Sequence, residues 1–300
     1  MAKCLLVMIV LLVAPATGVA QTTLFGGIGR GGGPNQGEIV TIDQTTGAAT
    51  LVGDGATDPQ AGVTGLAFDS AGRLFASTIN APLFGGPPPV STLIQIDPLT
   101  GEQLAVVGTI RLADGASVVI NDLAIQPGTD VLFGTALNDT GTTNNLYTID
   151  KTTAVATFIG ATGVIGATLA FGPDGTLYQT SAEFDPPGTF QRAFLNTLDP
   201  ATAAVLTTSE PFTVHIGALA VRPTGGVIFA SSGMPGDIYT LSIQGVLTPV
   251  GNTGVGGPGD LAFTPVPTNK SQCKTGSWRT NFAFAFKNQG DCIQFVNTGK

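Results

Sequence analysis

The chain has 300 residues, of which 43% are hydrophobic and only 11% are charged, so it holds enough apolar material for a sizeable core. Its 12 basic and 20 acidic residues give a net charge of −8, which repels nucleic acid and anionic lipid. The composition therefore excludes a disordered chain and a basic nucleic-acid-binding protein, and it indicates a globular protein.

Residues 1–20 have the pattern of a secretory signal peptide. Lys3 precedes an apolar run from Cys4 to Val13, and small residues follow. This run is about half of the ~20 residues that a membrane-spanning helix needs. We therefore expect a mature chain that starts near Gln21, has no membrane span, and is secreted or held in the cell envelope of a bacterium.

A stretch of two apolar runs joined by a tight turn recurs along the chain. Its clearest copy is LAFGPDGTLY, and the copies begin at Leu66, Leu123, Leu169, Leu219 and Leu261. An alternating run that ends in a turn, such as LYTIDKTTA, and a further apolar run, such as ATFIG, accompany the copies. Each unit of about 40 to 50 residues thus predicts four short strands, which is the pattern of a β-propeller.

The two ends of the chain predict how the ring closes. The last copy, LAFTP from Leu261, lacks its second strand, whereas Leu24–Phe25 has no partner. An N-terminal strand would complete the last blade and leave no exposed sheet edge there. We expect an all-β fold of five four-stranded blades over residues 21–267. A ring of six stays open, because 57 residues separate Leu66 from Leu123.

The unit LYTIDKTTAVATFIGATGVIGATLAFGPDGTLYQTS resembles the secreted bacterial repeat propellers, and the likeness covers about Thr22 to Pro267. This resemblance implies a fold but no activity, because propellers include lectins, hydrolases, lyases and scaffolds. The chain is also remotely similar to the lactonase and regucalcin propellers, in which carboxylate and amide groups gather around one divalent cation. That ligand pattern is not reproduced here.

Residues 268–300 follow the linker TPVPTN as a separate segment. The stretches KSQCKTGSW and FKNQGDCIQFV resemble a short tail found at the end of unrelated exported bacterial proteins. Removal of Cys4 on export leaves Cys273 and Cys292, which we expect to form a disulfide worth about 3 kcal/mol. A metal site is the weaker alternative, since a tetrahedral site needs four ligands. The tail either packs on the propeller or attaches the protein to a surface.

Polar residues stand directly before three of the five repeated leucines. That position holds Gly65, Asp122, Thr168, Ala218 and Asp260, with Asn121 beside Asp122 and His215 four residues before Leu219. We expect these residues at one mouth of the central channel. There the oxygens of Asp122 and Asp260 could hold a cation such as Ca²⁺ or bind sugar hydroxyls. The alternative is that both carboxylates accept backbone N–H groups where strands begin.

Loop length predicts which face of the ring binds a ligand. The long connections are Gly26–Gly37, Ile79–Thr92, Ala136–Asn145 and Ser181–Ala193, and all belong to the same face. Long loops on a rigid scaffold commonly carry binding groups. Glu183, Asp185 and Arg192 occur in no other unit and form a second candidate site. The glycine run GGIGRGGG is interpreted as a flexible loop, because a strand follows it where a dinucleotide site needs a helix.

These features favour an exported, non-enzymatic binding protein that needs no cofactor and whose ligand is an extracellular carbohydrate or protein. One alternative is a lactonase-like or glycan-cleaving propeller that uses a channel cation or the carboxyl groups of Asp122 and Asp260. Another is a structural protein of the cell envelope. His215 alone is a weak indication of catalysis, because no G-x-S-x-G motif accompanies it. The sequence does not specify an oligomeric state.

Overall fold

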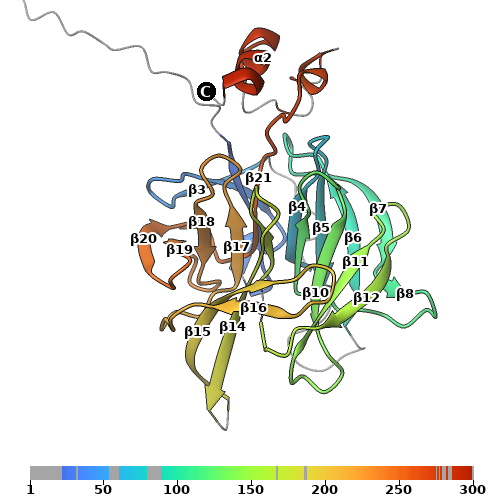
Figure 1. The fold of residues 1–300 in the computed structure, drawn as a ribbon, viewed down its shortest axis with the longest axis vertical. Coiled ribbons are helices and arrows are strands. Elements are labelled where there is room, and N and C mark those ends of the chain that lie inside the picture. The colour runs from blue at the N-terminus through green and yellow to red at the C-terminus, as the bar shows by residue number, and fades with distance from the viewer. Residues whose placement is uncertain are drawn as a thin grey trace, which may run out of the picture.

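The structure is a computed structural model that describes residues 22–31, 33–53, 61–79, 89–166, 168–185, 188–274, 276, 278, 282 and 286–298. The described strands form five antiparallel sheets around one axis, with the C-terminal tail at one end (Figure 1). The five-bladed β-propeller predicted from the repeats is therefore confirmed, and the alternative of six blades is not. The expected signal peptide lies outside the described residues.

The first two blades contain both ends of the propeller chain. Blade 1 consists of β21 (Pro258–Phe263), β1 (Leu24–Ile28), β2 (Ile39–Ile42) and β3 (Ala49–Leu51), in that order from the axis. Blade 2 consists of β4 (Gly62–Phe68), β5 (Leu74–Ile79), β6 (Ser91–Ile96) and β7 (Gln103–Thr109). A short 3-10 helix, η1 (Gly33–Asn35), lies between β1 and β2.

The remaining blades repeat the same order of strands. Blade 3 consists of β9 (Asp122–Ile125), β10 (Leu132–Leu137), β11 (Asn144–Ile149) and β12 (Val155–Ala161). Blade 4 consists of β13 (Ala170–Phe171), β14 (Leu177–Asp185), β15 (Thr189–Leu198) and β16 (Val205–Thr208). Blade 5 consists of β17 (Ala218–Val221), β18 (Ile228–Ser231), β19 (Asp237–Leu241) and β20 (Leu247–Asn252).

The N-terminal strand closes the ring, as the sequence predicts. β1 pairs with β21 in antiparallel register, with Leu24 opposite Phe263 and Phe25 opposite Ala262. The N-terminal segment supplies the three outer strands of blade 1, and the end of the propeller chain supplies its inner strand. Blade 1 can therefore form only when both ends of the chain are in place.

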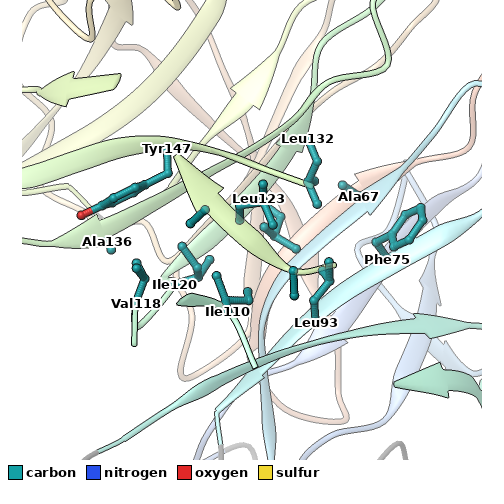
Figure 2. Close-up of a cluster of buried hydrophobic side chains, with 13 residues drawn as sticks. Ala67, Phe75, Leu93, Ile110, Val118, Ile120, Leu123, Leu132, Ala136 and Tyr147 are labelled. Carbon is teal, nitrogen blue, oxygen red and sulfur yellow. The ribbon is translucent and has the colours of Figure 1, made fainter. Parts of the chain in front are cut away.

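A small hairpin between blades 2 and 3 explains part of the long step between Leu66 and Leu123. β8 (Arg111–Leu112) pairs in parallel with the outer strand β12 and turns back through a bridge from Arg111 to Ser117. Its neighbours Ile110, Val118 and Ile120 are buried in the core between blades 2 and 3 (Figure 2). The extra residues therefore fill an interface and do not form a sixth blade.

Glycines in the outer strands let successive blades approach one another closely. A Cβ atom added at Gly53, Gly160 or Gly251 would overlap the backbone of Thr100, Thr202 or Thr46 in the turn of the next blade. Between blades 4 and 5 the glycine is on the other side, where Gly245 of the turn faces the Glu210 carbonyl. The glycines of the repeated V-G, I-G and T-G pairs therefore lie where two blades touch. A larger residue would not fit at these positions.

The aspartates of the repeated I-D-x-x-T-G turns act locally. Oδ1 of Asp43 accepts hydrogen bonds from the N–H groups of Thr45 and Thr46 at 2.8 and 2.9 Å and from the Thr45 hydroxyl at 2.6 Å. These bonds lower the pKa of Asp43 to about 2. Asp150 makes the same three bonds. The repeated aspartates are therefore turn residues.

Of two segments interpreted as loops, one is mainly strand and the other begins inside a strand. β14 continues to Asp185 and β15 begins at Thr189, so most of 181–193 forms a paired hairpin in which Glu183 stands opposite Arg192. Alternating aromatic residues and this cross-strand pair extend the ladder, which leaves only a short turn. Gly26 and Gly27 likewise lie buried in β1, where Val63 of blade 2 leaves no room for a side chain at Gly27.

The tail has a small core of its own and contacts the propeller. It contains the 3-10 helix η2 (Lys270–Cys273) and the helix α2 (Gln289–Thr298), joined by the predicted disulfide between Cys273 and Cys292. Both cysteines are buried with Phe282, Phe286 and Phe295, and Val266 of the linker packs against this cluster. Among the described residues, no helix is long and apolar enough to cross a bilayer.

The glycine contact that closes the ring is testable by one substitution. Gly47 has a φ of +74° and lies in the β2–β3 turn, where an added Cβ would be 2.7 Å from the carbonyl carbon of Gly251. We expect Gly47→Ala to lower the free energy of unfolding by clearly more than the ~1–2 kcal/mol that a left-handed alanine costs. Urea unfolding measures the change.

Gly254 is the matched control for this prediction. It has the same φ of +74°, but an added Cβ would meet nothing within 4 Å. Gly254→Ala should therefore lose only about 1 to 2 kcal/mol, the backbone component alone. Equal losses in the two variants would contradict the close contact between blades 5 and 1.

Candidate functional site

The residues that precede the repeated leucines form one layer across the ring. Gly65, Asp122, Thr168, Ala218 and Asp260 each pair with a residue of the next strand in the same blade: Ser77, Thr135, Thr180, Ser231 and Gly27. Every residue of this layer is buried. Asp122 and Asp260, which the sequence places at a channel mouth, have no exposed surface at all.

Each buried carboxylate joins its own strand to the next blade. Asp260 accepts the N–H groups of Leu261 and of Leu66 in β4, at 2.6 and 2.5 Å. Asp122 accepts those of Leu123 and of Leu169 in blade 4, at 2.6 and 2.8 Å. The two aspartates therefore connect four of the five inner segments through backbone hydrogen bonds.

The two carboxyl groups also contact each other across the axis. Burial raises the pKa of Asp260 to about 7. Burial, together with the charge of Asp260, raises the pKa of Asp122 well above its usual value. A hydrogen bond between the two side chains raises the pKa of Asp122 and lowers that of Asp260, so it favours a proton on Asp122 and a negative charge on Asp260. At neutral pH the pair therefore retains a proton that unfolded aspartates would release.

This arrangement satisfies the carboxyl oxygens within the protein. Their acceptor positions are directed at backbone N–H groups and at each other, and a ligand has no exposed surface to reach. Carboxyl oxygens that are already used in this way do not fit a cation between the two groups. In the part of the chain that the structure describes, no cluster of three or more His, Cys, Asp or Glu is placed to hold a metal ion. The Ca²⁺ site stays a prediction that this geometry does not support.

The other residues predicted around the channel occupy different environments. Thr168 is buried and its hydroxyl lies 2.8 Å from that of Thr180. Asn121 is half-buried, and its N–H donates to the carbonyl of Thr135 at 2.8 Å. His215 lies away from the aspartate layer, beside the β14–β15 hairpin. The predicted channel set is therefore divided between a buried layer and a surface hairpin.

The β14–β15 hairpin gathers the second group of predicted residues. Nε of Arg192 lies 2.7 Å from Oε2 of Glu183, and both side chains are about half exposed, so we expect this ion pair to contribute little to stability. Asp185 is exposed at the end of β14. The structure thus places Glu183, Asp185 and Arg192 on one hairpin. His215, which the sequence did not associate with them, contacts the same hairpin through Phe184 and Phe190.

Aromatic residues that the sequence analysis did not select complete this surface. The ring centroids of Phe184 and Phe190 lie 6.2 and 5.5 Å from that of His215, and 6.1 Å from each other. Phe184 is 41% exposed. Burial by its aromatic neighbours lowers the pKa of His215. The hairpin therefore carries an aromatic group, Phe184, Phe190 and His215, in addition to its ion pair.

A cavity of about 550 Å³ occupies the opposite half of the ring. It begins at the five repeated leucines, below the aspartate layer, and opens on the face that carries the short turns and the tail. The sequence analysis assigned ligand binding to the other face, which carries the long connections. The sequence feature that could have indicated the cavity is the repeated L-A-F, L-A-I or L-A-V strand, because these strands form its wall.

No protein-family model matches this chain, and no curated protein matches it. Solved structures resemble it in fold. A nidogen/laminin complex matches with a TM-score of 0.48 and 14% identity, over 81% of this chain and 98% of that one. A protein of unknown function from Bacteroides caccae matches with a TM-score of 0.48 and 11% identity, over 81% of this chain and 99% of that one. An aldose sugar dehydrogenase from Streptomyces coelicolor matches with a TM-score of 0.45 and 12% identity, over 82% of this chain and 86% of that one.

The protonated aspartate pair predicts an unusual dependence of stability on pH. Unfolded aspartates lose their protons near pH 4, whereas burial raises the pKa of Asp260 to about 7 and that of Asp122 well above its usual value, so the folded pair retains a proton up to about pH 7. Between these limits unfolding releases a proton. The free energy of unfolding should therefore fall by up to about 1.4 kcal/mol for each pH unit from 4 to 7. Urea unfolding at several pH values measures the slope.

Two substitutions distinguish the effect of this pair on the pH dependence of stability from the effect of other carboxylates. In Asp122→Asn the amide can donate to Asp260 without a titrating proton, so the slope should become shallower. Asp174→Asn is the control, because turn hydrogen bonds lower the pKa of Asp174 and confine its effect to pH below about 4. A wild-type protein whose stability is flat or rises from pH 4 to 7 would contradict the shared proton.

Proposed function

We propose that this protein is an exported binding module that recognises a protein partner through the β14–β15 hairpin and the face around it. The observation that carries the proposal is a break in the repeat at this hairpin. β14 and β15 have nine and ten residues, whereas the other described strands have seven or fewer. The hairpin extends from the face opposite the tail (Figure 1).

The chemistry of the hairpin suits an interface. Exposed Phe184 supplies a rigid apolar contact, and Glu183 and Arg192 of the same hairpin supply charged groups of both signs. Aromatic residues and arginine are enriched among the residues that contribute most to binding in protein interfaces. None of these side chains is repeated in the other blades, so the fold alone does not require them.

Neighbouring blades add apolar surface to the same face. Leu137 at the end of β10 is 46% exposed, and Met234 between β18 and β19 is 68% exposed. Blades 3, 4 and 5 thus each contribute one large apolar side chain around the hairpin. A protein partner fits such a dispersed surface better than a sugar, which needs a compact set of hydrogen-bonding groups.

The disulfide supports action outside the cytosol. A buried bond between Cys273 and Cys292 is stable in an oxidising compartment and uncommon in the cytosol. An enzymatic role at Asp122 and Asp260 receives no such support, because both carboxyl groups lack the surface that a substrate must contact. The binding role therefore rests on the hairpin and not on the channel.

Site-specific photo-crosslinking in the cells that produce the protein tests the proposal. A p-benzoylphenylalanine replaces Phe184 in one variant and Phe158 in another. Phe158 is 53% exposed on the outer strand β12 and is the matched control. We expect a discrete protein adduct from position 184 and none from position 158. No adduct, or the same adduct from both positions, would count against the hairpin.

The affinity of a purified adduct partner provides the quantitative check. Phe184→Ser should weaken binding by about 2 kcal/mol or more, the usual effect of removing a central aromatic contact. Phe158→Ser should leave the affinity within about 0.5 kcal/mol of the wild type. If a panel of soluble glycans binds the wild type and Phe184→Ser abolishes that binding, the partner is a carbohydrate and the proposal of a protein partner is wrong.

A further inference from the structure

The inner strands line the turn-side cavity with three stacked layers of apolar side chains. The layer farthest from the turns consists of Leu66, Leu123, Leu169, Leu219 and Leu261. Five alanines form the middle layer: Ala67, Ala124, Ala170, Ala220 and Ala262. Phe68, Ile125, Phe171, Val221 and Phe263 form the layer nearest the turns. Three residues of extended strand give these layers a depth of about 10 Å.

Exposure increases steadily from one layer to the next. The leucines are 1 to 2% exposed, the alanines 4 to 6%, and Phe68, Phe171, Val221 and Phe263 8 to 9%, with Ile125 more exposed. Asp122 and Asp260, one residue beyond the leucines, are fully buried. The cavity is therefore a funnel that narrows toward the leucines and is closed by the aspartate layer.

The charged groups at the mouth are already paired. Asp69 is buried and contacts Arg73 at 2.6 Å and Lys151 at 3.5 Å. The carboxylate of Asp130 accepts the N–H and hydroxyl of Ser70 at 2.9 and 2.7 Å and lies 4.0 Å from Lys151. The three inner layers contain no ionisable side chain. A ligand that enters them meets apolar groups, and its charge would gain no partner.

The tail forms one side of the mouth. Thr268, Asn269 and Gln272 line the cavity together with Pro265 and Val266. The side chain of Gln272 accepts the N–H groups of Thr268 and Asn269 at 2.8 and 3.1 Å, and Oδ1 of Asn269 accepts the N–H of Gln272 at 3.2 Å. Val266 also packs on the disulfide cluster. The tail therefore holds neutral hydrogen-bonding groups at a fixed place over the funnel.

We propose that this funnel is a binding site for a small, uncharged, mainly apolar molecule, inserted between the five inner strands with its polar end toward Thr268, Asn269 and Gln272. The volume of about 550 Å³ lies within the range of small-molecule sites, and the lining has their usual composition of many apolar groups and few polar ones. This site is separate from the hairpin face and does not depend on a protein partner there.

Titration of the full-length mature protein with N-phenyl-1-naphthylamine tests the site. This uncharged dye becomes fluorescent in apolar surroundings, so we expect saturable binding to one site. Ile125→Trp fills the layer of the funnel nearest the mouth and should weaken binding roughly tenfold or more. Leu99→Ser removes an apolar group that is 62% exposed outside the funnel and should leave binding unchanged. Equal binding by Ile125→Trp and the wild type would overturn the proposal.

Xenon binding provides a test that requires no variant. Apolar cavities that stay dry take up xenon, whereas polar cavities filled by ordered water do not. We expect xenon-pressurised crystals of the mature protein to show xenon between the leucine and alanine layers. Absence of xenon there, with ordered water in its place, would contradict an apolar site even if the dye bound elsewhere.

Discussion

The contact between Asp122 and Asp260 is the constraint on which the centre of this propeller depends. Inner strands of a ring have their backbone N–H groups directed at neighbouring blades, and buried N–H groups need acceptors. Here two side chains supply these acceptors for four inner segments, across the boundary between blades 1 and 2 and that between blades 3 and 4. Two charged carboxylates could not share this buried space, so a retained proton is part of the fold.

The same layer determines where ligands can go. It closes the channel, so the long-loop face and the turn face are chemically separate surfaces. The hairpin carries exposed Phe184 and the ion pair of Glu183 and Arg192, whereas the turn face opens into an apolar funnel with the tail at its rim. A partner on one face therefore has no direct contact with a molecule bound in the other. The shared element is the aspartate layer between them.

The repeat made most of the fold predictable from the sequence. The spacing of Leu66, Leu123, Leu169, Leu219 and Leu261 gave the number of blades, and the unpartnered Leu24–Phe25 gave the closure. Glycines at the positions of Gly53, Gly160 and Gly251 also recur in the sequence. They are needed because of contacts between blades, which are part of the tertiary structure. Each allows a turn from another blade to approach, and no local pattern reveals which turn that is.

The candidate sites were less predictable because they depend on where side chains meet. Asp122 and Asp260 are 138 residues apart, and only the ring places them in contact. Their position before the inner strand suggested a channel mouth, but burial of the whole layer could not be deduced from that position. His215 meets Phe184 and Phe190 only because blade 5 begins beside the hairpin. The sequence analysis missed the funnel because its lining repeats in every blade and was interpreted only as the repeated strand of the fold.

Titration of the aspartate side-chain carboxyl carbons by ¹³C NMR tests the account at its centre. In the folded mature protein, we expect the carboxyl resonance of Asp260 to titrate near pH 7 and that of Asp122 well above the usual range of an aspartate, and each to disappear in its own Asp→Asn variant. The turn aspartates Asp43 and Asp150 should titrate below the usual range in the same spectra. If every aspartate titrates below about pH 5, the two carboxyl groups do not share a buried proton, and the sealed layer described here is wrong.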